Sequence, residues 1–257
     1  MAVAVGAFWM GTLALRPTDD ERSQSWDSEP PLVVVDAGHG GHDGGAVANQ
    51  LIEKDTALDI AQRLKTRLGA QGLRVLMTRD KDVFIPLEKR ATIANDTHAA
   101  AFVSVHLNTA VEDAATIHGL ETYFSDAKGL QTIRLIKDRL KIPTAVKLED
   151  RRGKELAESI QRITCRRTKA ENRGTKERGL TVIHGTACPS VLVECGFLTH
   201  KKEAGRLNQA GYKDSLASGI ADGVVAFLRA QSLQPRRGLI LTEPKSVSPM
   251  EPLTARN

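Results

Sequence analysis

The sequence predicts an α/β protein: a single domain with a mostly parallel sheet flanked by helices and an active site at the C-terminal strand ends. Short apolar runs rich in β-branched residues, such as Val33 to Val35, alternate along the chain with segments whose apolar residues recur at helical spacing. Strands that alternate with helices form βαβ units with parallel sheets, and ligands bind such sheets beyond the carboxyl ends of the strands.

Length and composition are those of a soluble globular protein. A chain of 257 residues with 41% hydrophobic and 26% charged residues can bury one full core and still leave tails. We divide it into an apolar leader and polar linker at 1–30, a folded domain at 31–231, and a flexible, proline-containing tail at 232–257. The net charge of +5 favours anionic surroundings, but few aromatic residues interleave with the basic ones, which argues against a nucleic-acid partner.

The apolar leader, Met1 to Leu15, predicts an exported protein in the periplasm or cell envelope. It is shorter than the roughly 20 residues that span a bilayer. It is similar to the core of a signal peptide but lacks basic residues before it and a clear small-x-small cleavage site, so an anchor or a plain apolar tail is the alternative. Cys165, Cys188 and Cys195 show no CxxC spacing and indicate neither a disulfide framework nor a cysteine metal site.

The first half of the domain shows the clearest alternation of elements. A buried strand at Val33 to Val35 ends near Asp36 and leads into the loop GHGGHDGG, whose glycines allow tight bends and the close approach of a ligand. The elements expected after this loop are a helix at 53–68, a strand at 73–77, a helix at 86–94 and a buried strand at 101–105.

The second half is less regular. We expect a strand at 120–124 near the sheet edge, a charged and partly helical stretch at 126–176, a short strand at Val182 and Ile183, a buried strand at 191–193 and a closing helix at 212–229.

Three of the predicted strands are followed by a histidine or a carboxylate. His39, His106 and Glu194 would therefore meet in one crevice, and Glu53, at the start of the first helix, could fold back over the same edge. Two imidazoles and one carboxylate with a position left for water are typical of catalytic zinc, while manganese, cobalt or iron could also fit. Glu194 would then act as the general base. His42 lies three residues from His39, and spacing alone does not choose between them.

Each of these residues also has a simpler interpretation. A histidine at a strand end is commonly satisfied by hydrogen bonds. Glu53 would be favoured at a helix start by the helix dipole, and Glu194 could cap the next turn. The combination of the four groups at one edge favours the metal site over these separate explanations.

Several segments occur in the order typical of a known family. They are VVVDAGHGGHDGGA at 33–46, Glu53-Lys54, VLMTRDKD at 75–82, LEKRATIAN at 87–95, AFVSVHLN at 101–108, GLETY at 119–123, NRGTK at 172–176 and PSVLVECGFLTH at 189–200. Together they cover roughly residues 32–228. In this ordered set the sequence resembles the type 3 N-acetylmuramoyl-L-alanine amidases, which are zinc-dependent bacterial cell-wall enzymes.

The resemblance implies roles for individual residues. It implies that His39, Glu53 and His106 bind Zn²⁺ and that Glu194 is catalytic, which decides between His39 and His42. It also implies that Arg79, Asn108 and Arg173 lie near the groove and steady the substrate. A guanidinium such as that of Arg173 suits a peptide carboxylate, although a surface acid could occupy it instead.

The implied reaction is hydrolysis of the amide between N-acetylmuramic acid and L-alanine in peptidoglycan. We expect a monomer with peptidoglycan as its substrate and a regulatory protein as a possible partner. The alternatives are a non-catalytic peptidoglycan-binding protein and a zinc peptidase or deacetylase on the same scaffold. Two departures stand out: residues 109–118 are too few for the helix that plugs the site in some relatives, and 126–171 follows the family pattern poorly.

Overall fold

The computed structural model describes residue 26 and residues 29–125 and 152–233. The predicted leader, most of the linker, residues 126–151 of the charged stretch and all but the first two residues of the predicted tail lie outside the described residues. The three-part division of the chain therefore stays a prediction.

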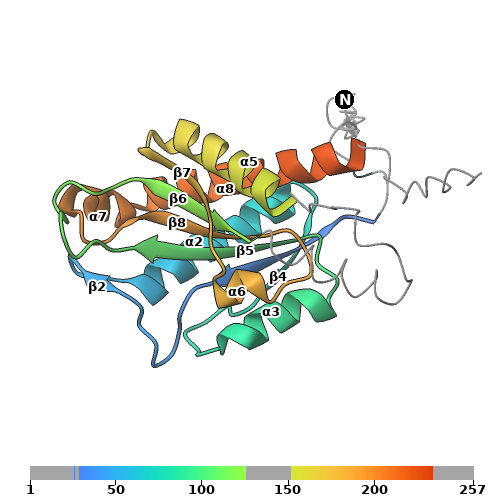
Figure 1. Ribbon diagram of the computed structural model, residues 1–257, viewed down its shortest axis with the longest axis horizontal. Helices are drawn as coiled ribbons and strands as arrows, with labels where there is room; N and C mark the ends of the chain where they lie inside the picture. The colour runs from blue at the N-terminus through green and yellow to red at the C-terminus, as the bar shows by residue number, and fades with distance from the viewer. Residues whose placement is uncertain (1–25, 27–28, 126–151, 234–257) are drawn as a thin grey trace, which may run out of the picture.

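A six-stranded sheet forms the centre of the molecule, in the order β4-β1-β5-β8-β6-β7 (Figure 1). Four neighbouring strands run parallel, whereas β6 is antiparallel to β8 and parallel to β7, so the predicted mostly parallel sheet is confirmed. The strands are β1 (Leu32–Ala37), β4 (Arg74–Met77), β5 (Ala101–Asn108), β6 (Leu120–Phe124), β7 (Asn172–Glu177) and β8 (Ser190–Phe197), with a separate antiparallel pair β2 (Val47–Ala48) and β3 (Leu51–Ile52).

Helices cover both faces of this sheet (Figure 1). One face packs against α2 (Glu53–Ala70), α5 (Arg152–Thr168) and α8 (Ala210–Leu233), and the other against α3 (Leu87–Asp96) and α6 (Thr181–His184). The short α7 (Lys201–Leu207) follows β8 at the edge where the carboxyl ends of the parallel strands meet. Within the described ranges, no helix has the length and apolar character needed to cross a bilayer.

The valines of β1 show why the central strands are continuously apolar. Successive side chains of a strand point to opposite faces, and here both faces are covered. Val33 and Val35 pack in the larger core beneath α2 and α8, while Val34 packs in the smaller core beneath α3 and α6. All three valines are fully buried.

The structure corrects two predicted elements and contains others that were not predicted, among them the β2–β3 pair. Val182 and Ile183 belong to helix α6 rather than to a strand, because their burial against Phe102 and Leu192 outweighs their β-branched preference. Residues 172–177, expected within a partly helical stretch, form the edge strand β7, whose charged sequence NRGTKE lacks apolar alternation because an edge strand stays partly exposed. Helix α7 was not predicted.

A buried ion pair joins the end of β1 to α3. Asp36 is fully buried, and its Oδ1 lies 2.9 Å from Nη1 of Arg90, whose side chain is 2% exposed. The hydroxyl of Thr78 donates to the same oxygen at 2.6 Å, and the hydroxyl of Ser104 donates to the other at 2.6 Å. Every oxygen of this buried carboxylate is thus hydrogen-bonded, as burial of a charge requires.

Arg90 also supports the loop that follows β1. Its Nη1 donates to the carbonyl of Ala37 at 2.6 Å, and its Nη2 donates to the carbonyl of His39 at 2.6 Å. The backbone of His39 has φ of 59°, a left-handed conformation that a non-glycine residue adopts only when its surroundings hold it. The Asp36–Arg90 pair therefore positions His39 through its backbone.

We predict that Arg90→Met lowers the free energy of unfolding by about 3–5 kcal/mol, because it leaves the buried Asp36 charge without its partner. Arg67→Met is the control, since Arg67 pairs with Asp214 at 3.7 Å on the surface and its side chain is 49% exposed; its effect should not exceed about 1 kcal/mol. Urea denaturation of both variants measures the difference. Similar losses for the two would contradict the role given to the buried pair.

Candidate metal centre

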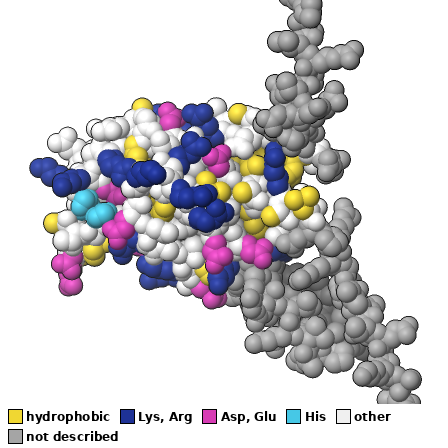
Figure 2. Space-filling view, turned by 90° about the horizontal axis from the view of Figure 1, so that it is seen from above, with side chains coloured by type: hydrophobic (Ala, Val, Ile, Leu, Met, Phe, Trp, Pro, Cys, Tyr) yellow, Lys and Arg dark blue, Asp and Glu magenta, His cyan; other side chains and the backbone are white. Residues whose placement is uncertain are grey.

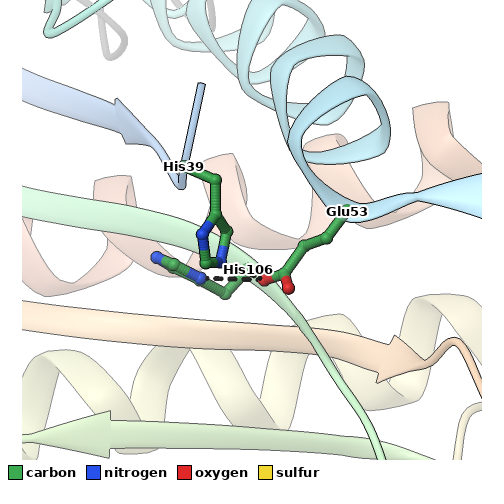
Figure 3. Close-up of side chains that lie close together, drawn as sticks. All are labelled: His39, Glu53 and His106. Carbon is green, nitrogen blue, oxygen red and sulfur yellow. Dashed lines mark hydrogen bonds and ion pairs between the residues drawn. The ribbon is translucent and has the colours of Figure 1, made fainter. Parts of the chain in front are cut away.

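Three side chains meet at the carboxyl edge of the sheet. Oε1 of Glu53 lies 3.0 Å from Nε2 of His39 and 2.9 Å from Nδ1 of His106 (Figure 3). One ligand atom from each of the three residues lies within 4.8 Å of the other two. His39 comes from the loop after β1, Glu53 is the first residue of α2, and His106 lies near the end of β5. The convergence predicted from the strand ends is what the structure shows.

Further hydrogen bonds hold the histidine and the carboxylate in these orientations. Nδ1 of His39 lies 2.8 Å from Oδ2 of Asp43, which leaves Nε2 of the ring facing Glu53. The Leu107 amide donates to Oε1 of Glu53 at 3.1 Å, and the Ala46 amide donates to Oε2 at 2.9 Å. A carboxylate behind a histidine is a common second layer of metal sites, where it orients the ring and raises its basicity.

Two glycines are required by how closely the backbone approaches these side chains. A Cβ on Gly38 would lie 2.4 Å from Cε1 of His106, which is closer than any real contact. A Cβ on Gly45 would lie 2.6 Å from Oε2 of Glu53 and 2.7 Å from Cδ2 of His39, and Gly45 has φ of +63°. The glycine-rich loop is thus shaped around the three candidate ligands.

Electrostatics keep the carboxylate ionised. Burial by itself would raise the pKa of Glu53, but hydrogen bonds with His106 and His39 lower that pKa far below its usual range. Burial would likewise lower the pKa of His39, but Glu53 and then Asp43 raise it above its ordinary value. An anionic carboxylate between two imidazoles is a donor set suited to a metal cation.

The structure decides between the two histidines of the loop. His42 is exposed, and its ring packs on that of Phe84 with the centroids 4.2 Å apart. It lies outside the group formed by His39, Glu53 and His106. Of the two histidines, His39 is therefore the one that joins the candidate ligand group.

Glu194 lies beside this group on the next strand. It pairs with His106 in the parallel register of β5 and β8, so both side chains are on the same face of the sheet. The predicted strand at 191–193 would end before Glu194, whereas in the structure Glu194 lies within β8. Its Oε2 is buried and has no hydrogen-bond partner among the described residues.

Burial raises the pKa of the Glu194 carboxyl to about 7, an effect that nearby Glu53 and Glu121 reinforce and His106 opposes. A carboxyl group of this kind can take up and release a proton near neutral pH. Its unpartnered buried oxygen also needs a polar partner. The His39, Glu53 and His106 group, with this oxygen next to it, fits a metal ion that carries a water molecule.

The side chain of Arg79 is buried and hydrogen-bonds to backbone carbonyls around the candidate metal centre. Its Nε donates to the Ala37 carbonyl at 2.9 Å. Its Nη2 donates to the carbonyls of Gly38 at 2.7 Å and Lys54 at 2.8 Å. These contacts tie the loop after β1 to the start of α2, so that the role of Arg79 as a substrate contact stays a prediction.

Asn108 and Arg173 both contact Glu121, a residue that the sequence analysis did not single out. Nε of Arg173 lies 3.0 Å from Oε1 of Glu121, and Nδ2 of Asn108 donates to the same oxygen at 3.4 Å. A charge inside the buried run LETYF was the available signal, because a buried carboxylate requires partners. Between β5 and β6, residues 109–118 form bends and turns without a helix, as the short spacing predicts.

Comparison with known proteins identifies the family. A model of the N-acetylmuramoyl-L-alanine amidases matches residues 33–226. The chain belongs to the N-acetylmuramoyl-L-alanine amidase family. The amidase LytC of Bacillus subtilis is 34% identical over 197 residues, which make up 77% of this chain and 35% of LytC, so the chain spans about a third of that relative.

Solved amidase structures show the same fold. The N-acetylmuramoyl-L-alanine amidase of Clostridium difficile 630 superposes with a TM-score of 0.68 at 32% identity, over 79% of this chain and all of that one. The CwlD amidase of Clostridioides difficile, solved in complex with the GerS lipoprotein, gives 0.66 at 27% identity, over 78% and 99% of the two chains. The predicted family and fold are confirmed.

We predict that Gly45→Ala weakens the binding of a divalent metal ion by about 10–100-fold, because the added methyl group displaces Glu53 and His39. Gly44→Ala is the matched control, since its Cβ would meet nothing closer than Cγ2 of Ile52 at 3.8 Å. Titration of metal-free protein with cobalt(II), followed by absorbance, measures both affinities. Equal affinities would show that the loop does not shape the site.

Proposed function

We propose that this chain is a zinc-dependent hydrolase of the amide bond between N-acetylmuramic acid and L-alanine in peptidoglycan, and so remodels the cell wall. The observation that carries the proposal is the meeting of His39, Glu53 and His106 beside Glu194 at the edge of the sheet, in a chain of the amidase family. Cleavage at this bond separates the stem peptide from the glycan strand.

Zinc is the metal that best fits these residues. Two imidazole nitrogens and one carboxylate oxygen, with no thiolate, match the three-ligand sets of zinc hydrolases, which keep a fourth position for water or substrate. When bound, zinc supplies a Lewis acid for the amide carbonyl and lowers the pKa of a water molecule to about 7.

Glu194 supplies the proton transfers. As a carboxylate it takes a proton from the attacking water, and as a carboxylic acid it returns that proton to the alanine nitrogen, so that the amide C–N bond breaks and an amine leaves. A pKa of about 7 allows one group to do both at neutral pH. Asn108 and Arg173, which both contact Glu121, are proposed to contact the substrate.

The same proposal covers location and partners. Peptidoglycan lies outside the cytoplasm, so the protein is exported, with the apolar leader as the signal or anchor. Figure 2 shows Lys and Arg side chains spread over much of the face on the side of α5, which suits the anionic polymers of a cell wall. We propose that the protein is a monomer and that a regulatory protein can bind it. The CwlD amidase, solved in complex with the GerS lipoprotein, is a relative that has a protein partner.

We predict that Glu194→Gln binds zinc with unchanged stoichiometry but loses about 10²–10⁴-fold in kcat, because the general base is removed while the ligands stay. Glu158→Gln, an identical change on the exposed side of α5, is the control and should keep full activity. Release of stem peptide from purified peptidoglycan measures the rate. Near-normal hydrolysis by Glu194→Gln would exclude the proposed role.

The products distinguish the alternative functions. Mass spectrometry of digested peptidoglycan should show free stem peptides that begin with L-alanine, together with glycan strands that lack them. Release of D-alanine would indicate a peptidase, and release of acetate a deacetylase. Absence of any product from the zinc-loaded protein would indicate a peptidoglycan-binding protein.

A further inference from the structure

Glu121 is a buried carboxylate surrounded by hydrogen-bond donors. The residue is 3% exposed. Besides Arg173 and Asn108, its partners are the ammonium group of Lys176, which contacts Oε2, and the hydroxyl of Tyr123, which lies 3.2 Å from the same oxygen. Burial would raise the pKa of Glu121, but Lys176 and Arg173 lower it below its ordinary value. Glu121 is thus an anion at neutral pH.

This carboxylate continues a row of residues that begins at the metal centre. His106 on β5 pairs with Glu194 on β8, and Glu194 pairs with Glu121 on β6. Directly paired residues lie on the same face of a sheet, and neighbouring strands are about 4.8 Å apart. Glu121 therefore lies roughly 10 Å from His106 along the row, or about three extended residues of a peptide.

The two cations held by Glu121, Arg173 and Lys176, are partly exposed and keep hydrogen-bond donors that Glu121 does not use. The side chain of Arg173 is 27% exposed and that of Lys176 is 41% exposed. Among the described residues, Arg173 hydrogen-bonds to Glu121 through Nε alone, while Lys176 uses one of its three ammonium hydrogens. Two cations around one carboxylate leave an excess positive charge at the surface, which is more than a structural ion pair needs.

We propose that Glu121 is a positioning residue that holds Arg173 and Lys176 to receive a carboxylate of the stem peptide, within about three residues of the scissile amide. This inference rests on the proposed function, and it specifies how the substrate lies across the strands of the sheet. The peptide extends from the metal centre across β8 toward β6 and β7, and the glycan extends the opposite way, toward β1. The substrate class is an acidic peptide rather than any N-acylated alanine.

The guanidinium of Arg173 is further restrained by the ring of Phe197. Its Cζ lies 5.1 Å from the ring centroid, within the range of a cation–π contact. Phe197 lies on β8, three residues after Glu194. Contacts with Glu121 on one side and Phe197 on the other reduce the freedom of Arg173, so less entropy is lost when a carboxylate binds.

The test compares two N-acetylmuramoyl-L-alanyl tripeptides, one with free peptide carboxyl groups and one with them amidated. We expect the zinc-loaded protein to cleave the free form with a kcat/KM about tenfold higher, through a lower KM. Glu121→Gln, and separately the double variant Arg173→Gln with Lys176→Gln, should lose this preference because the KM for the free form rises toward that for the amidated form, while the zinc content stays unchanged. Lys65→Gln, on the exposed side of α2, should keep the preference.

Equal cleavage of both peptides by the unmodified protein would overturn the inference and leave the proposed function standing. A loss of kcat on both peptides in Glu121→Gln would also overturn it, because that result places Glu121 in support of Glu194 instead. Should Glu121→Gln fail to fold, the double variant decides alone, and a retained preference there overturns the proposal. Cleavage of neither peptide by the unmodified protein would contradict the proposed function itself.

Discussion

The site depends on one constraint: the first turn of α2 must place the Glu53 carboxylate between imidazoles that come from two different strands. Glu53 directly follows the β2–β3 pair, and its amide donates to the Ala46 carbonyl at 2.9 Å, so the loop after β1 folds back before the helix begins. Because β1 and β5 are parallel neighbours, the loop after β1, which carries His39, and the carboxyl end of β5, which carries His106, lie at the same edge of the sheet. One oxygen of the carboxylate, Oε1, then contacts both rings, at 3.0 Å from Nε2 of His39 and 2.9 Å from Nδ1 of His106.

The surroundings of this carboxylate act together. Arg90, paired with Asp36, holds the backbone of His39 by a hydrogen bond to its carbonyl, and Asp43 orients the ring of His39. Gly45 leaves room where a side chain would press on Glu53. Each of these interactions fixes the position of one of the three candidate ligands. The strained backbone of His39 is therefore stabilised by hydrogen bonds from buried residues outside the loop, such as Arg90.

Sequence patterns predicted much of this arrangement because its main signals are local. Apolar β-branched runs identified β1, β5 and β8, and the polar residues at their ends, His39, His106 and Glu194, followed the edge rule for parallel sheets. What could not be predicted depends on contacts between distant segments. The edge strand β7 has no apolar alternation, and the partners of Glu121 and Arg79 become visible only when the strands are paired.

The central claim is that His39, Glu53 and His106 share one metal ion. Anomalous diffraction from crystals of the zinc-loaded protein, recorded on both sides of the zinc absorption edge, tests this most directly. The account predicts one strong anomalous peak within bonding distance of Nε2 of His39, the Glu53 carboxylate and the His106 ring, with Glu194 close by and not coordinated. A peak bound by His42, or no peak between the two imidazoles, would contradict it.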